Sequence, residues 1–359
     1  MLWLKAQAAD RLDGTVEGVR DSLQLAIELE HSTIPPYLYA LYSLKPESNR
    51  EIAKIIKSVV LEEMLHMSLA CNVLNAVGGR PEIDSPRFIP NYPTPLPGTV
   101  ESGLVVPLAA FSMDILTGVF MVIEEPEKPL EIPVIPPLMA MSGAPAQEDK
   151  ALTIGEFYEK IMEQIAGLSC QGIFTGEPNR QLRTTFEQLP IFPVTDEKSA
   201  LRALGLIVDQ GEGTKTSPFD KEKEPAHYYR YAEIYEGYSL IPNPDHSPGA
   251  PPYIYGGAPL KFDPKGVLPV VKNPDPSMYP AGSPAALANE SFNQTYTALL
   301  QGLHAAFNGE PDRLAPALVG MQALHQLASY MMTIEFEPGQ TAGPTFDYLD
   351  TRFSPEGRS

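Results

Sequence analysis

The sequence predicts a mainly α-helical fold, a four-helix bundle with additional helices and long proline-rich loops. Apolar residues recur over long stretches with the 3.6-residue period of amphipathic helices. The 38 prolines among 359 residues are about twice the usual share, and they gather between these stretches. The composition, 43% hydrophobic and 20% charged, is that of a globular chain with a sizeable core.

The periodic stretches define the organisation of the chain. Core helices are predicted at about 16–43, 49–77, 153–168 and 224–235, and a C-terminal helical hairpin at about 285–333. Further helices are predicted at about 108–123 and 197–208, and a small β-hairpin at 251–271, where apolar residues alternate around a Gly-Gly pair. No internal repeat or polar linker divides the chain. Residues 1–359 are therefore expected to form a single domain with insertions.

Local signals set several helix ends. Pro35 and Pro36 remove two amide donors, so the first helix is expected to kink or end there. Gly78 and Gly79 should end the second helix. Thr153 and Glu156 have the spacing of a capping box, which predicts that the third core helix opens at this point.

Charge and cysteine content exclude several classes of function. Lys and Arg number 26 against 45 Asp and Glu, a net charge of −19 that repels nucleic acid and anionic membranes. No apolar run is long enough to span a bilayer, and the N-terminus lacks the features of a signal peptide, so we expect a cytoplasmic protein. Cys71 and Cys170 are too few for a disulfide framework or a thiolate zinc site.

Three Glu-x-x-His pairs occur, a spacing that places a carboxylate and an imidazole on one helix face. They are Glu28/His31, Glu63/His66 and Glu224/His227. Glu63 and His66 lie in the middle of the apolar stripe of their helix and should point into the core. A bare carboxylate there would cost several kcal/mol. It must be protonated, paired or bound to a cation.

The other helices supply further candidates. Glu30 also lies in an apolar stripe, whereas Glu28 and His31 are rotated away from it and are interpreted as a surface coincidence. Glu224 and His227 share a face with tyrosines, although Pro225 fits a helix only in its first turn.

A dinuclear bundle site needs one more carboxylate. The helix that opens at Thr153 offers Glu156, Glu159 and Glu163. Glu156 has a capping role and Glu163 lies opposite the apolar stripe, so Glu159 is preferred and Glu156 ranks next. Four carboxylates would balance two divalent cations, with two neutral imidazoles as further ligands.

Structural interpretations remain open for each candidate. A glutamate on an apolar stripe can pair with Lys or Arg, and a lone core histidine is more often satisfied by its neighbours than a ligand. Tyr37, Tyr158 and Tyr228 could hydrogen-bond to ligands, but core packing is the commoner role of such tyrosines.

The runs AIELEHSTIPPYLYALYSL and VVLEEMLHMSLACNVLNAVGG, followed by TIGEFYEKI and EPAHYYRYAEIYEG, resemble the ferritin-like domain of the iminophenylpyruvate dimer synthase family of violacein and chromopyrrolate pathways. The resemblance implies a ferritin-like bundle with metal ligands at Glu30, Glu63, His66, Glu224 and His227. It also implies an oxidative reaction that joins two imines of aromatic 2-oxo acids, which a partner oxidase makes from an amino acid.

The sequence thus favours a metal-dependent oxidase or oxygenase. Its cofactor would be two divalent ions, iron first, with manganese or zinc as alternatives. Its partners would be O2 and a small organic substrate, conceivably derived from an aromatic amino acid. A non-catalytic ferritin-like module for metal binding or storage and a mononuclear metal-assisted hydrolase are the alternatives. A homo-oligomer is compatible with the sequence.

Overall fold

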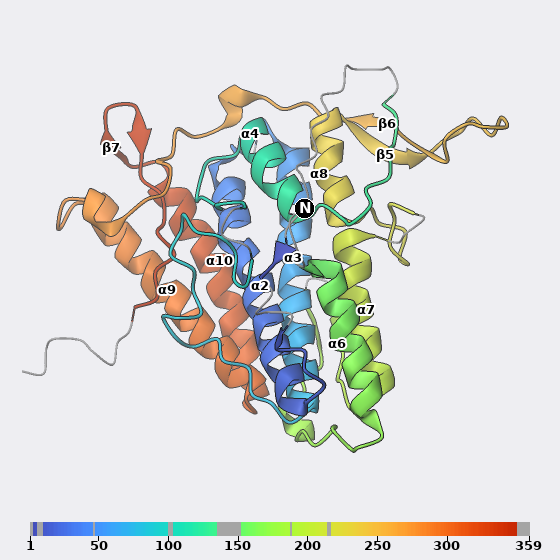
Figure 1. Cartoon of the computed structure of the whole chain (residues 1–359). Coiled ribbons are helices and arrows are strands. Elements are labelled where there is room, and N and C mark those ends of the chain that lie inside the picture. Colours follow the sequence, from blue (N-terminus) through green and yellow to red (C-terminus); the bar gives the residue numbers. More distant parts are fainter. Residues whose placement is uncertain are drawn as a thin grey trace, which may run out of the picture.

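The computed structural model describes residues 3–5, 10–45, 47–99, 103–134, 152–186, 189–213 and 217–349. The fold is mainly helical, as predicted, and the strands found within these residues form only short antiparallel pairs (Figure 1). The central helices are α2 (Val16–Ser43), α3 (Arg50–Ala76), α6 (Ile154–Ser169) and α7 (Glu197–Glu212). Helix α2 packs on α3 and α6, and α7 packs on the same two helices. These contacts close a four-helix bundle.

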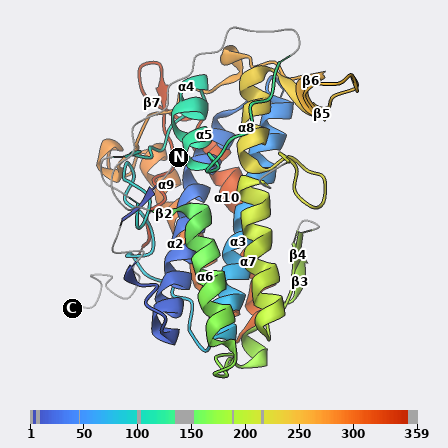
Figure 2. The same ribbon diagram turned by 45° about the vertical axis from the view of Figure 1, so that its right-hand side comes forward.

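Two corners of the bundle are built from shorter helices. Helices α6 and α7 have 16 residues each, against 28 in α2 and 27 in α3. In Figure 2, α8 (His227–Glu236) stands above α7, and a short helical segment stands above the upper end of α6. That segment comprises α4 (Met113–Ile115), the π-helical turn η1 (Leu116–Phe120) and α5 (Met121–Ile123). The predicted helix over 108–123 therefore begins only at Met113.

Helix α2 passes through Pro35 and Pro36 and ends only at Ser43, so the helix does not end at the prolines, one of the two outcomes that the sequence predicted. Pro36 has no amide hydrogen for the carbonyl of Ser32, four residues earlier. The Tyr92 hydroxyl donates to that carbonyl over 2.6 Å. This contact replaces the lost backbone hydrogen bond and lets the helix continue.

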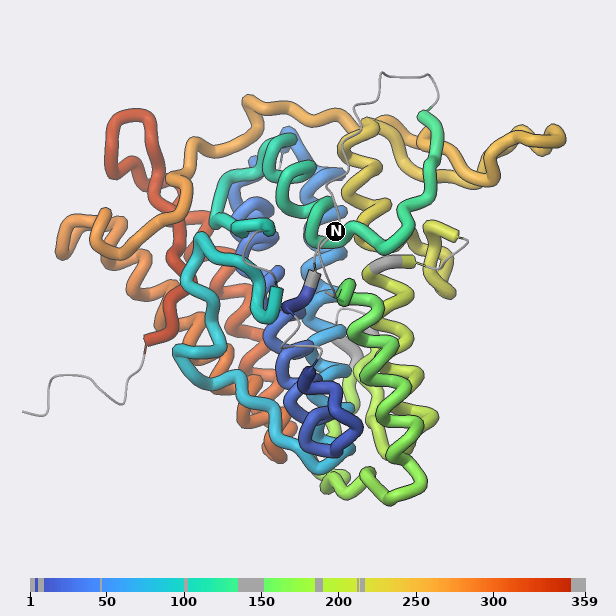
Figure 3. The backbone as a smooth tube through the Cα atoms, in the orientation of Figure 1, coloured from blue at the N-terminus to red at the C-terminus, as the bar shows by residue number. Residues whose placement is uncertain are grey.

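The segment between α3 and α4 runs along the outside of α2 (Figure 3). Its backbone amide at Glu82 donates to the side chain of Gln24, and Tyr92 reaches Ser32 further along the same helix. Hydrogen bonds to Gln24 and to Ser32 therefore hold this loop against α2.

The predicted helix signals are largely confirmed. Thr153 and Glu156 form the capping box that opens α6. The C-terminal hairpin consists of α9 (Pro284–Phe307) and α10 (Leu314–Met331), linked through the 3₁₀ turn η5 (Pro311–Arg313), and it packs against the outer side of α2 and α3. Further 3₁₀ turns are η2 (Pro178–Arg180), η3 (Pro264–Gly266) and η4 (Pro276–Met278).

The strands contribute little to the core. The β-hairpin predicted at 251–271 is misplaced, because β6 (Tyr253–Pro259) pairs with β5 (Tyr238–Pro242) upstream. The Gly-Gly pair lies inside β6 instead of at a turn. The other pairs are β1 (Trp3–Leu4) with β2 (Leu152–Thr153), β3 (Thr184–Phe186) with β4 (Leu189–Ile191), and β7 (Glu335–Glu337) with β8 (Gln340–Thr341). Among the described residues, no helix combines the length and apolarity needed to cross a bilayer.

Candidate metal centre

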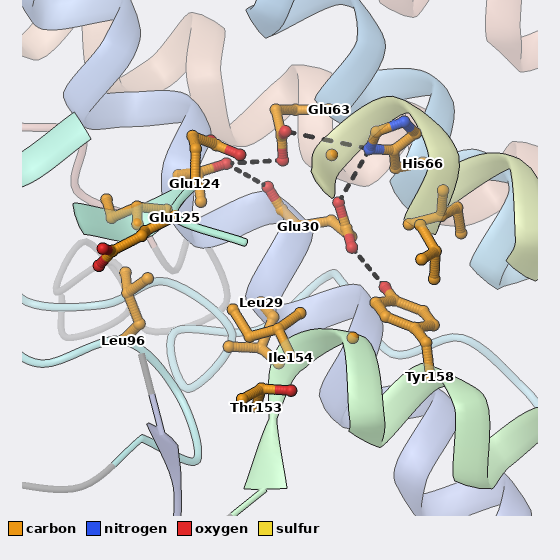
Figure 4. A pocket seen from close by; sticks show the side chains of 16 residues that line it. Leu29, Glu30, Glu63, His66, Leu96, Glu124, Glu125, Thr153, Ile154 and Tyr158 are labelled. Atoms are coloured by element: carbon orange, nitrogen blue, oxygen red, sulfur yellow. Dashed lines mark hydrogen bonds and ion pairs between the residues drawn. The ribbon is translucent and has the colours of Figure 1, made fainter. Parts of the chain in front are cut away.

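Five buried side chains converge inside the bundle. Glu30 comes from α2, Glu63 and His66 from α3, Glu124 from the residue after α5, and His227 from the first turn of α8. They form two triads, Glu30/Glu63/His66 and Glu63/Glu124/His227, and in each triad one potential ligand atom per residue lies within 4.8 Å of the others. Glu63 belongs to both. Figure 4 shows Glu30, Glu63 and His66 turned toward one another, with Glu124 beside them.

Both imidazoles direct Nδ1 at the carboxylates. His66 Nδ1 lies 3.4 Å from Glu30 Oε2 and 3.9 Å from Glu63 Oε1. His227 Nδ1 lies 2.9 Å from Glu63 Oε1 and 3.3 Å from Glu124 Oε2. The two rings are stacked, with centroids 5.4 Å apart. Two matching half-sites therefore share the Glu63 carboxylate.

The outer nitrogen of each ring has its own partner. His66 Nε2 lies 3.0 Å from Gln210 Oε1 on α7. His227 Nε2 lies 2.9 Å from Glu62 Oε2, and the other oxygen of Glu62 pairs with the Arg230 guanidinium at 2.9 Å. In the neutral form that binds a metal, the acceptor facing Nε2 of each ring favours the proton on Nε2 and leaves the lone pair on Nδ1.

Hydroxyl groups hold the carboxylates in place. Tyr158 on α6 donates to Glu30, and Tyr37 on α2 donates to Glu124. Thr33 Oγ1 donates to Glu63 Oε2 over 3.0 Å. Two of the tyrosines that the sequence singled out thus contact the cluster, whereas Tyr228 packs in a separate apolar group with Tyr229.

Burial and crowding shift the pKa values of this cluster strongly. Burial, together with the neighbouring Glu124 and Glu30 carboxylates, raises the pKa of Glu63 to about 7. Burial lowers the pKa of His227, but the surrounding Glu124, Glu62 and Glu63 carboxylates outweigh it and hold the value well above the usual one. Protons are thus retained where negative charge accumulates. A bound cation would perform the same neutralisation and displace them.

The residues present fit a pair of divalent cations. Nδ1 of His227 is fully buried and has no hydrogen-bond partner, although it faces two carboxylates. Once a cation displaces the proton, this buried nitrogen, which faces carboxylate oxygens, is suited to hold a metal ion. The donor set is oxygen and imidazole nitrogen. Cys71 lies in the core cluster and Cys170 is exposed, so neither supplies a thiolate.

A cavity of about 70 Å³ lies beside the cluster. Its walls include Glu30, Glu63, His66 and Glu124. The remaining lining is mostly apolar and comes from several helices and the loop after α3: Leu29, Leu96, Ile123, Ile154, Ile207 and Val208. The space holds several water-sized molecules. A small ligand could therefore reach the carboxylates.

Comparison with known families places the chain. A family model described as "Ferritin-like" matches residues 23–236, more than half of the sequence and the whole of the region that carries the cluster. The chain belongs to the ferritin-like family. A solved structure described as a ferritin-like protein from Caulobacter vibrioides is 25% identical, with a TM-score of 0.59, and the match covers 92% of this chain and 97% of that one. No curated protein matches the sequence.

Two predicted contributors to this ferritin-like site lie elsewhere. Glu159 is exposed, because α6 turns Phe157 and Ile161 into the bundle and its opposite side to solvent. Glu156 caps Thr153, as its spacing indicated, and does not reach the cluster. Glu163 is also exposed. The structure therefore does not bring a carboxylate of α6 to the site.

Glu224 is the third predicted contributor that the structure places elsewhere. Helix α8 begins at His227, and Glu224 lies before it on exposed chain. The Glu-x-x-His spacing joins two side chains only when both are helical. The N-cap residue Ala226 has an extended backbone, so Glu224 and Pro225 both lie outside the helix.

Glu124 supplies the carboxylate that the sequence analysis missed. Among the described residues three carboxylates converge, one fewer than predicted, with Glu62 one layer further out. The signal was a Glu-Glu doublet at the end of an apolar helical segment. Only the segment's position above α6 shows that Glu124 turns inward, while Figure 4 shows Glu125 lying further out. The π-helical turn just before it is a feature often found at functional sites.

The surface interpretation of Glu28/His31 is wrong for the histidine. His31 is buried, its Nε2 lies 2.8 Å from the Tyr296 hydroxyl, and burial lowers its pKa to about 3. The prediction assumed that α2 is covered on one side only. The C-terminal hairpin covers a second side.

Proposed function

We propose that this ferritin-like protein is a metal-dependent oxidase or oxygenase whose centre consists of two divalent ions bridged by Glu63. The membership of Glu63 in both triads is the observation that carries the proposal. Each half-site has its own histidine and one further glutamate, and the two share Glu63. Dinuclear centres in helix bundles are built in this way from glutamates and histidines on facing helices.

Iron is the preferred metal, with manganese next and zinc as a further candidate. Carboxylate and imidazole ligands suit all three, and no thiolate biases the site toward soft metals. When bound, redox-active ions would supply electrons to dioxygen. The three carboxylates of the triads, Glu30, Glu63 and Glu124, would offset three of the four positive charges of two divalent ions, which lowers the cost of burying them.

The chain's own residues perform the remaining tasks. The apolar lining keeps bulk water away from the reacting groups. Tyr158 and Tyr37 hold Glu30 and Glu124 by hydrogen bonds, which fixes carboxylate orientation. Tyr158 also lines the cavity, so its ring would contact a ligand bound there.

The substrate class follows only from the resemblance of the sequence. We propose a small organic molecule derived from an aromatic amino acid, as in the iminophenylpyruvate dimer synthase family. The mostly apolar lining supports a substrate with an apolar part. Leu29, Leu96 and Ile154 are the side chains that would contact it.

Two other functions make different predictions about metal. A mononuclear hydrolase would use the Glu30/Glu63/His66 triad alone, because that triad is complete and lines the cavity. A storage module would take up iron and consume O2 without an organic product.

Elemental analysis of protein purified without chelator tests the proposal. We expect about two metal ions per chain, and we expect Glu63→Ala and His66→Ala to lose metal, because each removes a ligand from the cluster. Glu163→Gln, an exposed change on α6, is the matched control and should retain both ions. Full metal content in Glu63→Ala and His66→Ala would contradict the assignment. One ion per chain would favour the hydrolase, and iron-dependent O2 uptake without oxidation of added aromatic 2-imino acids would favour storage.

A further inference from the structure

The two histidines of the centre differ in what lies behind them. Nε2 of His66 faces the neutral amide oxygen of Gln210 at 3.0 Å. Nε2 of His227 faces the Glu62 carboxylate at 2.9 Å. The half-sites are otherwise alike. Each has one imidazole, the shared Glu63 and one glutamate of its own, Glu30 beside His66 and Glu124 beside His227.

The charge behind His227 is firmly held. Arg230 pairs with Glu62 at 2.9 Å, and its own position is fixed by Nε, which donates to the Pro225 carbonyl over 2.6 Å, and by a hydrogen bond to Ser58 Oγ over 3.1 Å. Glu62 and Arg230 are both buried. The carboxylate cannot swing away from His227 without leaving the guanidinium unpaired in the interior.

This difference changes the strength of the two imidazole ligands. A ligating histidine that donates its outer N–H to a carboxylate becomes a more basic, more electron-rich donor than one that donates to an amide. Loss of such a partner typically reduces metal affinity about 10- to 100-fold. The half-site of His227 should therefore bind its ion more tightly.

The two half-sites also differ in their access to the cavity. The cavity wall includes Glu30, Glu63 and His66, the whole of one triad, but not His227. An added ligand thus has a direct path to the His66 half-site. The His227 half-site is reached from the cavity only through its carboxylates Glu63 and Glu124.

We infer that the two metal positions have separate roles: a tight, shielded position at His227, backed by Glu62 and Arg230, and a weaker position at His66 that faces the cavity and accepts the exogenous ligand. The inference rests on the proposed dinuclear function. Glu62, Arg230 and Gln210 act as positioning residues, because they contact the imidazoles or one another and belong to neither triad.

Titration of the metal-free protein with Co²⁺, followed by visible absorption and calorimetry, tests the inference. We expect two steps in the wild type, with dissociation constants at least tenfold apart. Glu62→Gln keeps the size of the side chain and removes its charge, so the tighter step should weaken about 10- to 100-fold while the weaker step changes little. Azide, a small anionic ligand, should alter the spectrum only after the second equivalent of Co²⁺.

The reciprocal variant guards against a folding artefact. Gln210→Glu places a carboxylate behind His66, so the weaker step should become about tenfold tighter, a gain that misfolding cannot produce. Two equal steps in the wild type, an effect of Glu62→Gln on the weaker step alone, or an azide response at the first equivalent would overturn the inference and leave the proposed function standing. Failure of the wild type to bind two Co²⁺ ions would refute the dinuclear function itself.

Discussion

Glu233 illustrates how a single buried carboxylate couples this fold to pH. It lies on α8, is buried, and accepts a hydrogen bond from the backbone amide of Leu240 over 2.7 Å. Burial raises its pKa from 4.5 to about 7. The folded protein therefore holds this proton more tightly than the unfolded chain does, and the stabilisation present below pH 4.5 is lost as the pH rises through 7.

We predict that Glu233→Gln stabilises the protein at pH 8 by about 2 kcal/mol and changes stability little at pH 4.5, because the amide retains an acceptor for Leu240 and removes the buried charge. Urea unfolding at both pH values measures the effect. The exposed Glu163→Gln should be neutral at both. An equal effect of Glu233→Gln at the two pH values would show that its charge is not responsible.

At the same scale, the sequence was informative where a polar residue interrupts an apolar stripe. Glu30, Glu63 and His66 were recognisable because burial of a bare carboxylate is costly on a long, regular helix. Glu124 and Glu62 were not, since neither has a distinctive spacing. Their roles depend on which short segment packs above α6 and on which side of α3 meets α8, and only tertiary structure determines both.

Among the elements, α2 depends on a side chain from outside the helix. The Tyr92 hydroxyl satisfies the Ser32 carbonyl that Pro36 leaves without a donor. We predict that Tyr92→Phe lowers the free energy of unfolding by about 1–3 kcal/mol, the range for an unsatisfied buried acceptor. Chemical denaturation measures it. Tyr330→Phe, at an exposed tyrosine of α10, is the control, and equal stability of the two variants would contradict the role given to Tyr92.

The elements were predictable to the extent that their signals are local. The capping box at Thr153 and the hairpin of α9 and α10 follow from nearby residues. The passage of α2 through two prolines could not be predicted, because the compensating hydroxyl lies some sixty residues away in sequence. The start of α8 at His227 depends in the same way on the packing of α8 against α3 and α7.

For the whole molecule, stability and metal content should be linked. The buried carboxylates of the cluster repel one another in the metal-free protein, and ions that bind only the folded state add about 2.7 kcal/mol per site at a hundredfold excess over Kd. We predict that Mn²⁺ raises the melting temperature of the chelator-treated protein by several degrees. Scanning calorimetry measures the shift. Glu63→Ala should show no Mn²⁺-dependent shift, and an unchanged wild-type melting curve would argue against linkage.

Because two positions of the bundle are filled by separate short helices, bound ions would also link segments that are distant in sequence. Glu30, Glu63 and His66 belong to the two long helices α2 and α3, whereas Glu124 and His227 lie on short segments far from them in sequence, His227 being 165 residues beyond its Glu62 partner. Bringing such distant segments together carries a loop-closure entropy that grows with the logarithm of the separation. Coordinated ions would act there as cross-links that hold α8 and the segment ending at Glu124 against the long helices α2 and α3.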